Sequence, residues 1–403
     1  MEPRGYGSGD PVDDVALKGF HLNGGTDGWT GCYSFNYDQD IKDEDCWNLT
    51  HTGISLGGSN DTDDILIEDV QVNKYKGEVI YNGGFGAGKV TVRRLWSHDS
   101  NGSAYNIAQA EYQKVTDSKF GPNVRFWGEL QAEGVPNATA IFKRNEYVDC
   151  NTGNGCLAIA ADTESNYVEG MSWTWKNNTF DIDPTNTTNR HFLLESGPYS
   201  LTIKDNTFNG GQIWIANKGA GSEVPTLNVS GNNHDAEGAY PFYMQSADLR
   251  GTISNNTFSN VQSLYKAVGG NLSSLAIENN TFDGAIGLNK GGGGPSVYAL
   301  ILDNTYLNSE LPIKTIASYT DKTVGPYTEK VQILGESGGS YNAKLGTKAS
   351  DGQRTTIFGG MGTITLPADS SAHTWTNDIT LSSSSDSVQV EFDRPTETWS
   401  IVE

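Results

Sequence analysis

A short pattern of alternating apolar and polar positions returns along most of this 403-residue chain. Its full form has eight positions: apolar, any residue, apolar, two further residues, asparagine, any residue and an aromatic ring. It reads LTIKDNTF at 201–208 and LAIENNTF at 275–282, and looser copies start at residues 65, 90, 113, 140, 173, 227, 251 and 299. Successive copies begin between 23 and 33 residues apart. A pattern that returns at such a period is typical of a solenoid, in which each repeat packs on the next.

The alternation within each copy predicts a β-strand, because helix-forming residues are few and the apolar positions have a period of two. A second short alternating segment lies between copies, as in GCLAIAA, HFLLES, GQIWIAN, PFYMQS and SLYKAV. Two or three strands in a turn of about 24 residues describe one coil of a parallel β-helix. We therefore predict an all-β fold whose coils stack about 4.8 Å apart around a continuous apolar core. Trp173 and Trp175 hold inward positions of their copy and belong to that core.

Asparagine occupies the sixth position of the pattern in seven consecutive copies. Asparagine tolerates the left-handed backbone of a tight corner, and stacked amides hydrogen-bond from one coil to the next. We predict an asparagine ladder at a turn, with a structural role, formed by Asn145, Asn178, Asn206, Asn232, Asn256, Asn280 and Asn304.

With this repeat and ladder, residues 15 to about 335 resemble the pectin-lyase-like right-handed parallel β-helix superfamily, which includes polysaccharide lyases, glycosidases and viral tailspikes. The resemblance implies a right-handed coil and, in character, is closest to the tailspikes. It leaves the activity open, because this fold hosts many unrelated functions. The polygalacturonase motifs of the family are not matched: the segments 150–153 and 155–159 lack their carboxylates, and the chain contains no Gly-His-Gly.

The pattern divides the chain into three parts. Residues 1–14 are a polar segment, residues 15–336 form the β-helix, and residues 337–403 hold short alternating strands that predict a small C-terminal β-subdomain for capping or oligomerisation. The first coil begins too early for an amphipathic capping helix before it, so we expect a partner or a further domain to cover that end. The C-terminal part is either a small sandwich or similar to the intertwined caps of virus spikes, and the second interpretation implies a homo-oligomer, with a trimer favoured.

Charge and composition exclude several classes of partner. The chain carries 49 acidic and 27 basic residues, a net charge of −22, which argues against nucleic acid because phosphate binding depends on clustered Lys and Arg. No apolar run reaches the roughly 18 residues of a membrane span, so we expect no membrane partner, and the first fifteen residues lack the apolar core of a signal peptide.

The cysteines form two local pairs, Cys32 with Cys46 and Cys150 with Cys156. Neither pair has the spacing of a zinc or redox motif, and two short-loop disulfides are the favoured interpretation, with four buried free thiols as the alternative. Disulfides and ten glycosylation sequons would suit an extracellular protein or a virion surface.

Ligands of a β-helix lie in a lateral groove, formed by outward side chains of one sheet. Aligning the second strands of successive coils places Trp127, Trp214, Tyr243 and Tyr265 outward in one row. Stacked aromatic faces suit sugar rings, so we predict a glycan-binding platform, with ordinary packing between coils as the alternative.

The same alignment places Glu129 and Glu195 two coils apart in one column, with Ala160 between them and about 9.6 Å between their backbones, and Asp162 nearby. Such a spacing is compatible with the acid and base of an inverting glycosidase. Solvated surface acids are the alternative interpretation, because a register slip of one residue would turn each carboxylate inward.

Other clusters give weaker signals. Residues 38–45 are rich in Asp and Glu, whose carboxylates could bind calcium, although the spacing of an EF-hand is absent. Apart from this candidate calcium site, we expect no metal site and no cofactor. His98 and Asp99 are either an orienting pair for a base or a solvated turn.

Two functions survive these observations. The first is an extracellular or virion-surface spike or adhesin, which recognises a cell-surface polysaccharide or glycoprotein and assembles with other surface subunits. The second is a secreted polysaccharide-degrading enzyme, a hydrolase or lyase acting in the lateral groove through Glu129, Asp162 and Glu195. The net charge of −22 disfavours a lyase acting on polyuronates, which the protein would repel at low salt.

Overall fold

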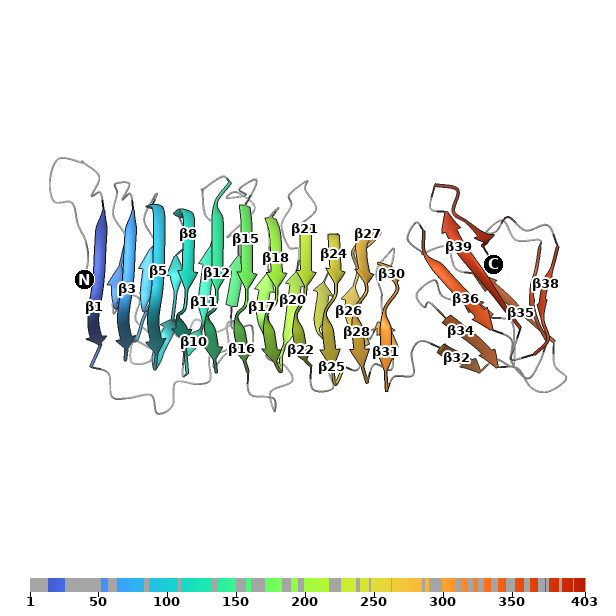
Figure 1. The fold of residues 1–403 in the computed structure, drawn as a ribbon, viewed down its shortest axis with the longest axis horizontal. Coiled ribbons are helices and arrows are strands. Elements are labelled where there is room, and N and C mark those ends of the chain that lie inside the picture. The colour runs from blue at the N-terminus through green and yellow to red at the C-terminus, as the bar shows by residue number, and fades with distance from the viewer. Residues whose placement is uncertain are drawn as a thin grey trace. The chain divides into compact units, whose positions relative to one another are not determined.

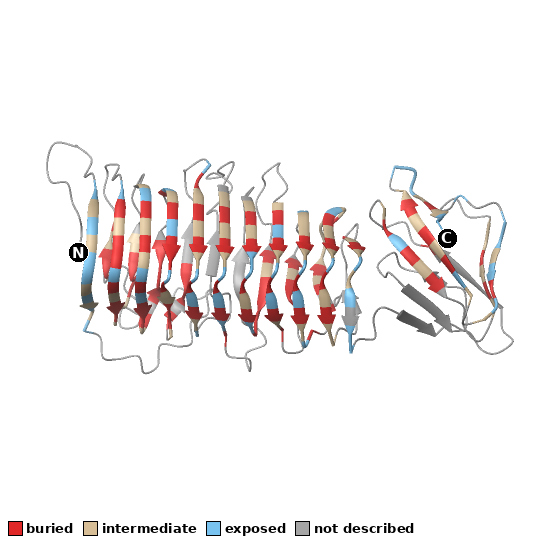
Figure 2. Ribbon diagram, in the orientation of Figure 1, coloured by how far each residue is buried: buried red, intermediate tan, exposed pale blue. Residues whose placement is uncertain are grey.

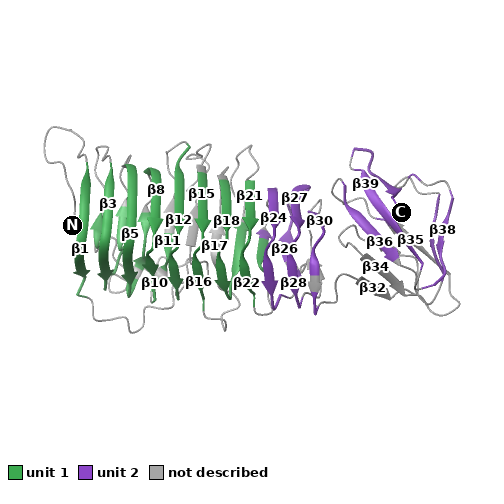
Figure 3. Cartoon of the chain, in the orientation of Figure 1, with its two compact units in different colours: residues 1–243 green, residues 244–403 purple. Residues whose placement is uncertain are grey.

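The computed structural model of the chain is built from β-strands. It describes residues 14–25, 52–56, 64–82, 87–107, 110–122, 124–131, 137–149, 157–160, 171–182, 190–194, 199–216, 226–236, 240–245, 248–261, 263–284, 287–289, 299–308, 313–317, 322–324, 330–334, 340–345, 352–358, 363–368, 374, 377–383, 386–393 and 395–402. The chain divides into two compact units, residues 1–243 and 244–403, which are described separately (Figure 3).

Eight strands of unit 1 stack in parallel: β1 first, and then one strand from each of the seven copies of the repeat that start between residues 65 and 227 (Figure 1). Their registers follow the repeat, since Ile65 pairs with Val90 and Trp173 pairs with Leu201. This parallel pairing confirms the predicted β-helix. The eight strands are β1 (Val15–Asn23), β3 (Ile65–Asn73), β5 (Ala87–His98), β8 (Ala110–Thr116), β12 (Thr139–Lys143), β15 (Met171–Lys176), β18 (Tyr199–Lys204) and β21 (Thr226–Ser230).

Shorter strands complete each coil of unit 1. The strands that follow the corner are β9 (Lys119–Phe120), β13 (Glu146–Val148), β16 (Thr179–Asp181), β19 (Thr207–Asn209) and β22 (Asn233–Asp235). A lateral sheet consists of β11 (Gly128–Gln131), β14 (Leu157–Ala160), β17 (Arg190–Leu194), β20 (Gln212–Ala216) and β23 (Phe242–Gln245). The first coils add β2 (Ile54–Ser55), β4 (Ile80–Asn82) and β7 (Asn106–Ile107), and the pair β6 (Ser100–Ser103) and β10 (Val124–Phe126).

A left-handed residue turns the chain at the corner between the long and short strands. It lies at the fifth position of the repeat, as at Asn177 (φ 56°) and Asp205 (φ 55°), one residue before the ladder asparagine. Our expectation that the ladder asparagine itself occupies the left-handed position is therefore corrected. The turn instead directs the next side chain into the coil, where Asn178 and Asn206 are only 2% and 1% exposed.

The ladder amides link each corner to the next coil. The backbone N–H of Asn178 donates to Asn206 Oδ1 at 2.8 Å, and that of Asn206 donates to Asn232 Oδ1 at 2.8 Å. In the other direction, Asn206 Nδ2 donates to the carbonyl of Trp175 at 3.0 Å. Asn145 continues the series by donating its N–H to Asn178 Oδ1 at 2.9 Å. Each amide thus supplies the hydrogen bonds that the interrupted strands cannot make at the bend.

Unit 2 repeats this arrangement in its own coils. Asn256 N–H donates to Asn280 Oδ1 and Asn280 N–H to Asn304 Oδ1, both at 3.0 Å. The ladder role is thereby confirmed for all seven asparagines. The coil strands of unit 2 are β24 (Arg250–Ser254), β25 (Thr257–Ser259), β26 (Ser263–Val268), β27 (Ser274–Glu278), β28 (Thr281–Asp283), β29 (Gly287–Asn289), β30 (Leu300–Leu302) and β31 (Thr305–Leu307).

The C-terminal part of unit 2 contains two further sheets, around a core that includes Ile357, Val390 and Trp399. The five-stranded sheet contains β32 (Ile313–Ala317), β34 (Lys330–Leu334), β36 (Arg354–Phe358), β39 (Ser387–Asp393) and β40 (Thr398–Ile401). The four-stranded sheet contains β33 (Lys322–Val324), β35 (Ser340–Leu345), β37 (Thr363–Leu366) and β38 (Ile379–Leu381). Strands from residue 313 onward thus join these sheets, and the domain boundary predicted at residue 336 stays a prediction.

A buried glutamine joins these sheets to the last coil of unit 2. Gln353 is 0% exposed, and its Oε1 accepts a hydrogen bond from the backbone N–H of Ile301 in β30 at 3.0 Å. Its Nε2 donates to the carbonyl of the same residue at 3.3 Å. The side chain therefore pairs with the strand edge as a neighbouring backbone would, which satisfies groups that an open edge leaves exposed.

Buried positions alternate along the strands of unit 1 (Figure 2). Inside its coils, aromatic rings stack at the spacing of neighbouring strands. The rings of Tyr147 and Phe180 lie 4.6 Å apart, and those of Phe180 and Phe208 lie 4.8 Å apart, both pairs within 5° of parallel. His234 continues this stack, 5.2 Å from Phe208, and its Nε2 donates to the carbonyl of Gly211 at 3.0 Å. The inward positions predicted for Trp173 and Trp175 are confirmed, at 4% and 0% exposure.

We predict that Asn206→Ala destabilises unit 1 by on the order of 3 kcal/mol, because it leaves the N–H of Asn178 and the carbonyl of Trp175 buried without these hydrogen bonds. Urea unfolding followed by circular dichroism measures the change. The matched control is Asn209→Ala, an exposed position in the next strand, which is expected to change stability by less than about 0.5 kcal/mol. Equal stabilities of the two variants would contradict the ladder role.

His234 predicts a pH-dependent stability. Burial lowers the pKa of His234 to about 4, so the folded protein holds it neutral where the unfolded chain, with a pKa near 6.5, binds a proton. Stability is therefore lost as the pH falls from about 6.5 towards 4, by up to about 3 kcal/mol from this group. His234→Phe should remove this part of the loss, as seen by denaturant unfolding at pH 7 and pH 5. The control is Phe208→Leu, which alters the same ring stack but involves no ionisable group. It should destabilise the protein equally at both pH values.

Candidate functional site

The lateral sheet of unit 1 is the face on which the sequence predicts a ligand groove. Its strands pair in parallel, with Leu193 of β17 opposite Trp214 of β20. On β20, Ile213 and Ile215 are each 1% exposed, whereas Trp214 between them is half-buried. On β23 the buried residues Phe242 and Met244 flank a half-buried Tyr243 in the same way. The predicted outward orientation of Trp214 and Tyr243 is therefore confirmed.

These two side chains form an aromatic surface with a third ring. The rings of Trp214 and Tyr243 stack at 5.2 Å with an interplanar angle of 17°. Tyr240 meets Tyr243 edge-on at 6.1 Å and 66°. We call Trp214, Tyr240 and Tyr243 the aromatic platform. Sequence reasoning missed Tyr240, although a tyrosine directly before Pro241 and the strand that follows was a visible signal.

The other two predicted platform residues face the core. Trp127 is 1% exposed and lies at the bend between β10 and β11. It packs 5.4 Å from the ring of Tyr147, and its Nε1 donates to the carbonyl of Val148 at 3.1 Å. The alignment placed this tryptophan in the strand, whereas β11 begins at Gly128. This prediction is thus wrong for Trp127.

Tyr265 is 0% exposed, as is Ala267, and Lys266 between them is half-buried. The alternation in β26 is therefore one residue out of step with the predicted row. A shift of one residue turns every side chain of a strand to its opposite face. Tyr265 consequently belongs to the core of unit 2, and its predicted outward position is wrong.

The predicted carboxylate column is also out of register, here by two residues, a shift that does not change the face on which a residue lies. Glu129 pairs with Ala158, and Gln131 pairs with Ala160, so the predicted alignment of Glu129 with Ala160 is wrong by two residues. Asp162 and Glu195 lie outside the described residues, and their role in catalysis stays a prediction. The same holds for the disulfide partners Cys32, Cys46, Cys150 and Cys156 and for the acidic segment 38–45.

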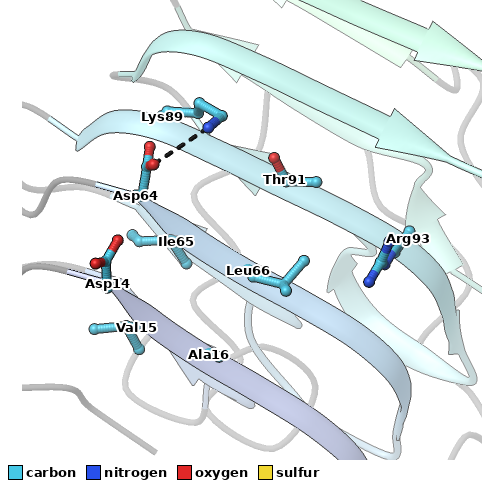
Figure 4. A pocket seen from close by; sticks show the side chains of 9 residues that line it. All are labelled: Asp14, Val15, Ala16, Asp64, Ile65, Leu66, Lys89, Thr91 and Arg93. Carbon is cyan, nitrogen blue, oxygen red and sulfur yellow. Dashed lines mark hydrogen bonds and ion pairs between the residues drawn. The ribbon is translucent and has the colours of Figure 1, made fainter.

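A shallow pocket of about 400 Å³ lies on β1, β3 and β5, around Leu66 and Thr91 (Figure 4). Two cations line it, and both are engaged by carboxylates. Lys89 contacts Asp64 at 3.2 Å, and Arg93 Nε contacts Glu68 Oε1 at 2.5 Å. This pairing makes the pocket a poor site for an anion, because a ligand would have to displace an existing ion pair.

Glu68 also accepts from Arg94 and contacts Lys18 at 3.4 Å, so three cations surround one carboxylate. The hydrogen bond from Arg93, followed by that from Arg94, lowers the pKa of Glu68. Arg94 further contacts Asp69 at 2.6 Å, and its hydrogen bond lowers the pKa of that carboxyl. Glu68 therefore stays ionised and joins three coils.

Charges of alternating sign follow one another at the left-handed corner: Asp69, Arg94, Asp117 and Arg144. Arg144 contacts Asp117 at 2.6 Å, repeating the pair formed by Arg94 and Asp69. Sequence reasoning missed this column, although the fifth position of the aligned copies shows the alternation. Attraction between neighbouring coils allows charged residues to stack at this spacing.

The sequence pair His98 and Asp99 is brought together, with His98 Nδ1 and Asp99 Oδ2 at 2.7 Å. The ring of His98 is stacked 4.1 Å from that of Trp96, and the His98 side chain is only 9% exposed. The alternative interpretation, in which His98 lies in a solvated turn, is therefore wrong, because its imidazole is buried. Trp96 and His98 lie on β5, which belongs to a different sheet from the lateral strands, and Asp99 follows directly after β5.

Comparison with known protein families, curated proteins and solved structures finds no match to this chain. Within the described residues, no group of three or more His, Cys, Asp or Glu side chains is placed to hold a metal ion. The described part of the chain contains no helix that is long and apolar enough to cross a membrane.

Proposed function

We propose that unit 1 binds glycans along its lateral sheet, as the recognition surface of an extracellular or virion-surface protein of the spike or adhesin type. The observation that carries this proposal is the aromatic platform: Trp214 and Tyr243 are half-buried, stack on successive strands, and meet Tyr240 nearly at a right angle. Rings with hydroxyl groups at a partly exposed face combine apolar area with hydrogen-bonding groups.

A sugar ring has faces of C–H groups and a rim of hydroxyls. The C–H faces gain dispersion contacts and desolvation against aromatic rings, and the hydroxyls find partners at the edge. The 66° angle between Tyr240 and Tyr243 presents two ring orientations to the same ligand. Such an arrangement discriminates between sugars by shape more than a single flat ring does.

The row that holds Trp214 continues by backbone register through Leu193 and Ala158 to Glu129. Equivalent positions therefore follow one another along the axis at the strand spacing of about 4.8 Å. A long polymer suits such a row better than a compact ligand. The net charge of −22 opposes a polyanionic ligand, so a neutral polysaccharide or glycoprotein glycan is the proposed partner.

The finer family relationship is part of the same proposal. The parallel coils and the amide ladder support membership of the pectin-lyase-like superfamily, in the character of a viral tailspike. The C-terminal sheets supply strands for assembly with other surface subunits, with a homotrimer favoured. Several platforms on one particle would raise the apparent affinity for a surface by the effective concentration of neighbouring sites.

We predict that Trp214→Ala combined with Tyr243→Ala weakens retention on immobilised neutral polysaccharides at least about tenfold. The test applies amylose, mannan, cellulose and chitin surfaces and measures dissociation of the purified chain. Tyr112→Ala, which removes a half-buried ring from β8, is the matched control and should bind as the unmodified protein does.

Unchanged binding by the double variant would reject the lateral sheet as the binding surface. The same incubations are assayed for new reducing or unsaturated ends. Turnover that Glu129→Gln abolishes would replace the binding proposal by the polysaccharide-degrading enzyme.

A further inference from the structure

An exposed tryptophan stands on another sheet of unit 1. Trp96 of β5 is 41% exposed, and among the Phe, Tyr and Trp side chains whose exposure the structure describes the others are half-buried or buried. By backbone register its neighbours on adjacent coils are Gln71 and Lys119, and His21 follows Gln71. The row is therefore polar except for one large ring.

The indole is held in place on two sides. Its Nε1 donates to the carbonyl of Gly121 at 3.3 Å, and its ring stacks on His98 at 4.1 Å and 24°. A side chain whose rotamer is fixed before binding loses little entropy when a ligand arrives. Folding has thus already ordered an apolar surface that faces solvent.

A hydrogen-bonded network fixes the imidazole beneath the indole. Gln71 Nε2 donates to His98 Nε2 at 2.9 Å, which leaves Nδ1 to donate to Asp99 Oδ2 at 2.7 Å. Asn73 Nδ2 is also directed at His98 Nε2, at 3.4 Å, and His21 Nε2 donates to Asn73 Oδ1 at 3.2 Å. Planar polar side chains from three coils therefore surround the base of one ring.

These observations favour a carbohydrate over other ligands. A protein interface buries roughly 800 Å² per partner with an apolar centre, whereas the row beside Trp96 is polar. A quaternary ammonium group is held in a cage of several aromatic faces, and here His98 already covers one face of the indole. One fixed aromatic face with planar hydrogen-bonding groups beside it fits the C–H face and the hydroxyl rim of a sugar.

We propose that Trp96, with Gln71 and Lys119 beside it, is a second glycan-binding site, on a sheet other than that of the aromatic platform. The choice of a glycan as the ligand rests on the proposed function. The location of the site rests on Trp96 and its neighbours, none of which belongs to the aromatic platform. Lys119 contacts Glu146 at 2.7 Å, so this cation is already balanced and the site suits a neutral sugar.

Isothermal titration calorimetry with maltohexaose, cellohexaose, mannohexaose and chitohexaose tests the proposal, using the full chain. The unmodified protein is expected to bind two equivalents of one hexasaccharide, and Trp96→Ala one. The variant with Trp214→Ala and Tyr243→Ala should also bind one, and the triple variant none. Trp96→Phe, which keeps a ring but loses the bond to Gly121, should bind at the Trp96 site about five- to tenfold more weakly than the unmodified protein.

A local readout separates binding at Trp96 from a change in folding. In protein labelled at histidine Cε1, the NMR resonance of His98, assigned with His98→Gln, should shift on adding the hexasaccharide. That of the buried His234 should not shift. An unmoved His98 resonance, or two equivalents bound by Trp96→Ala, would overturn the proposal.

The outcomes distinguish the two sites. If Trp96→Ala binds as the unmodified protein while the platform variant loses binding, the Trp96 site is rejected and the proposed function stands. If Trp96→Ala alone loses binding, the Trp96 site stands and the lateral sheet is rejected. If none of the four probes binds at millimolar concentration, both are rejected.

Discussion

Hydrogen bonding from coil to coil is the constraint on which this structure depends. At each corner the backbone bends and strand pairing is interrupted, which would leave N–H and C=O groups buried without partners. The asparagine at the sixth position supplies both missing functions, since its Oδ1 accepts from the N–H of the preceding ladder residue and its Nδ2 donates to a carbonyl of that coil. Gln353 applies the same chemistry at the last coil, where a side-chain amide pairs with the backbone of Ile301.

This constraint also sets the registers. Once the corners are aligned, residues of one repeat position lie above one another at the strand spacing. Inside, the eighth position becomes a stack of rings that runs from Phe120 through Tyr147 and Phe180 to Phe208. Outside, the fifth position becomes a column of alternating charge, and the surface rows bring together side chains about 25 residues apart, such as Gln71, Trp96 and Lys119. A regular interior therefore creates ordered surface chemistry without a closed pocket.

The surface rows show how such a fold acquires binding chemistry. On β5 a single ring faces solvent in a row of polar residues, and on the lateral sheet two half-buried rings stack on each other. Neighbouring groups hold these rings in place. The scaffold pays the ordering entropy when it folds, so a ligand meets fixed rings. Different rows on different sheets can then evolve separately, because a change at one outward position leaves the stacked core intact.

The sequence by itself determined the parallel β-helix, the seven ladder asparagines and the inward tryptophans of β15, because these features share one spacing that the repeated pattern displays directly. The left-handed corner residue was misplaced by one position, since asparagine occurs at both the fifth and the sixth position of several copies. Only the tertiary structure decided where the second strands begin and which faces they present: Trp127 lies at the bend before β11, and Tyr265 of β26 faces the core. Their connecting segments vary in length, and a period of two fits either face until pairing with a neighbouring coil selects one. The sequence likewise could not predict that Gln71, Trp96 and His98 form a cluster, because these residues come into contact only when successive coils stack.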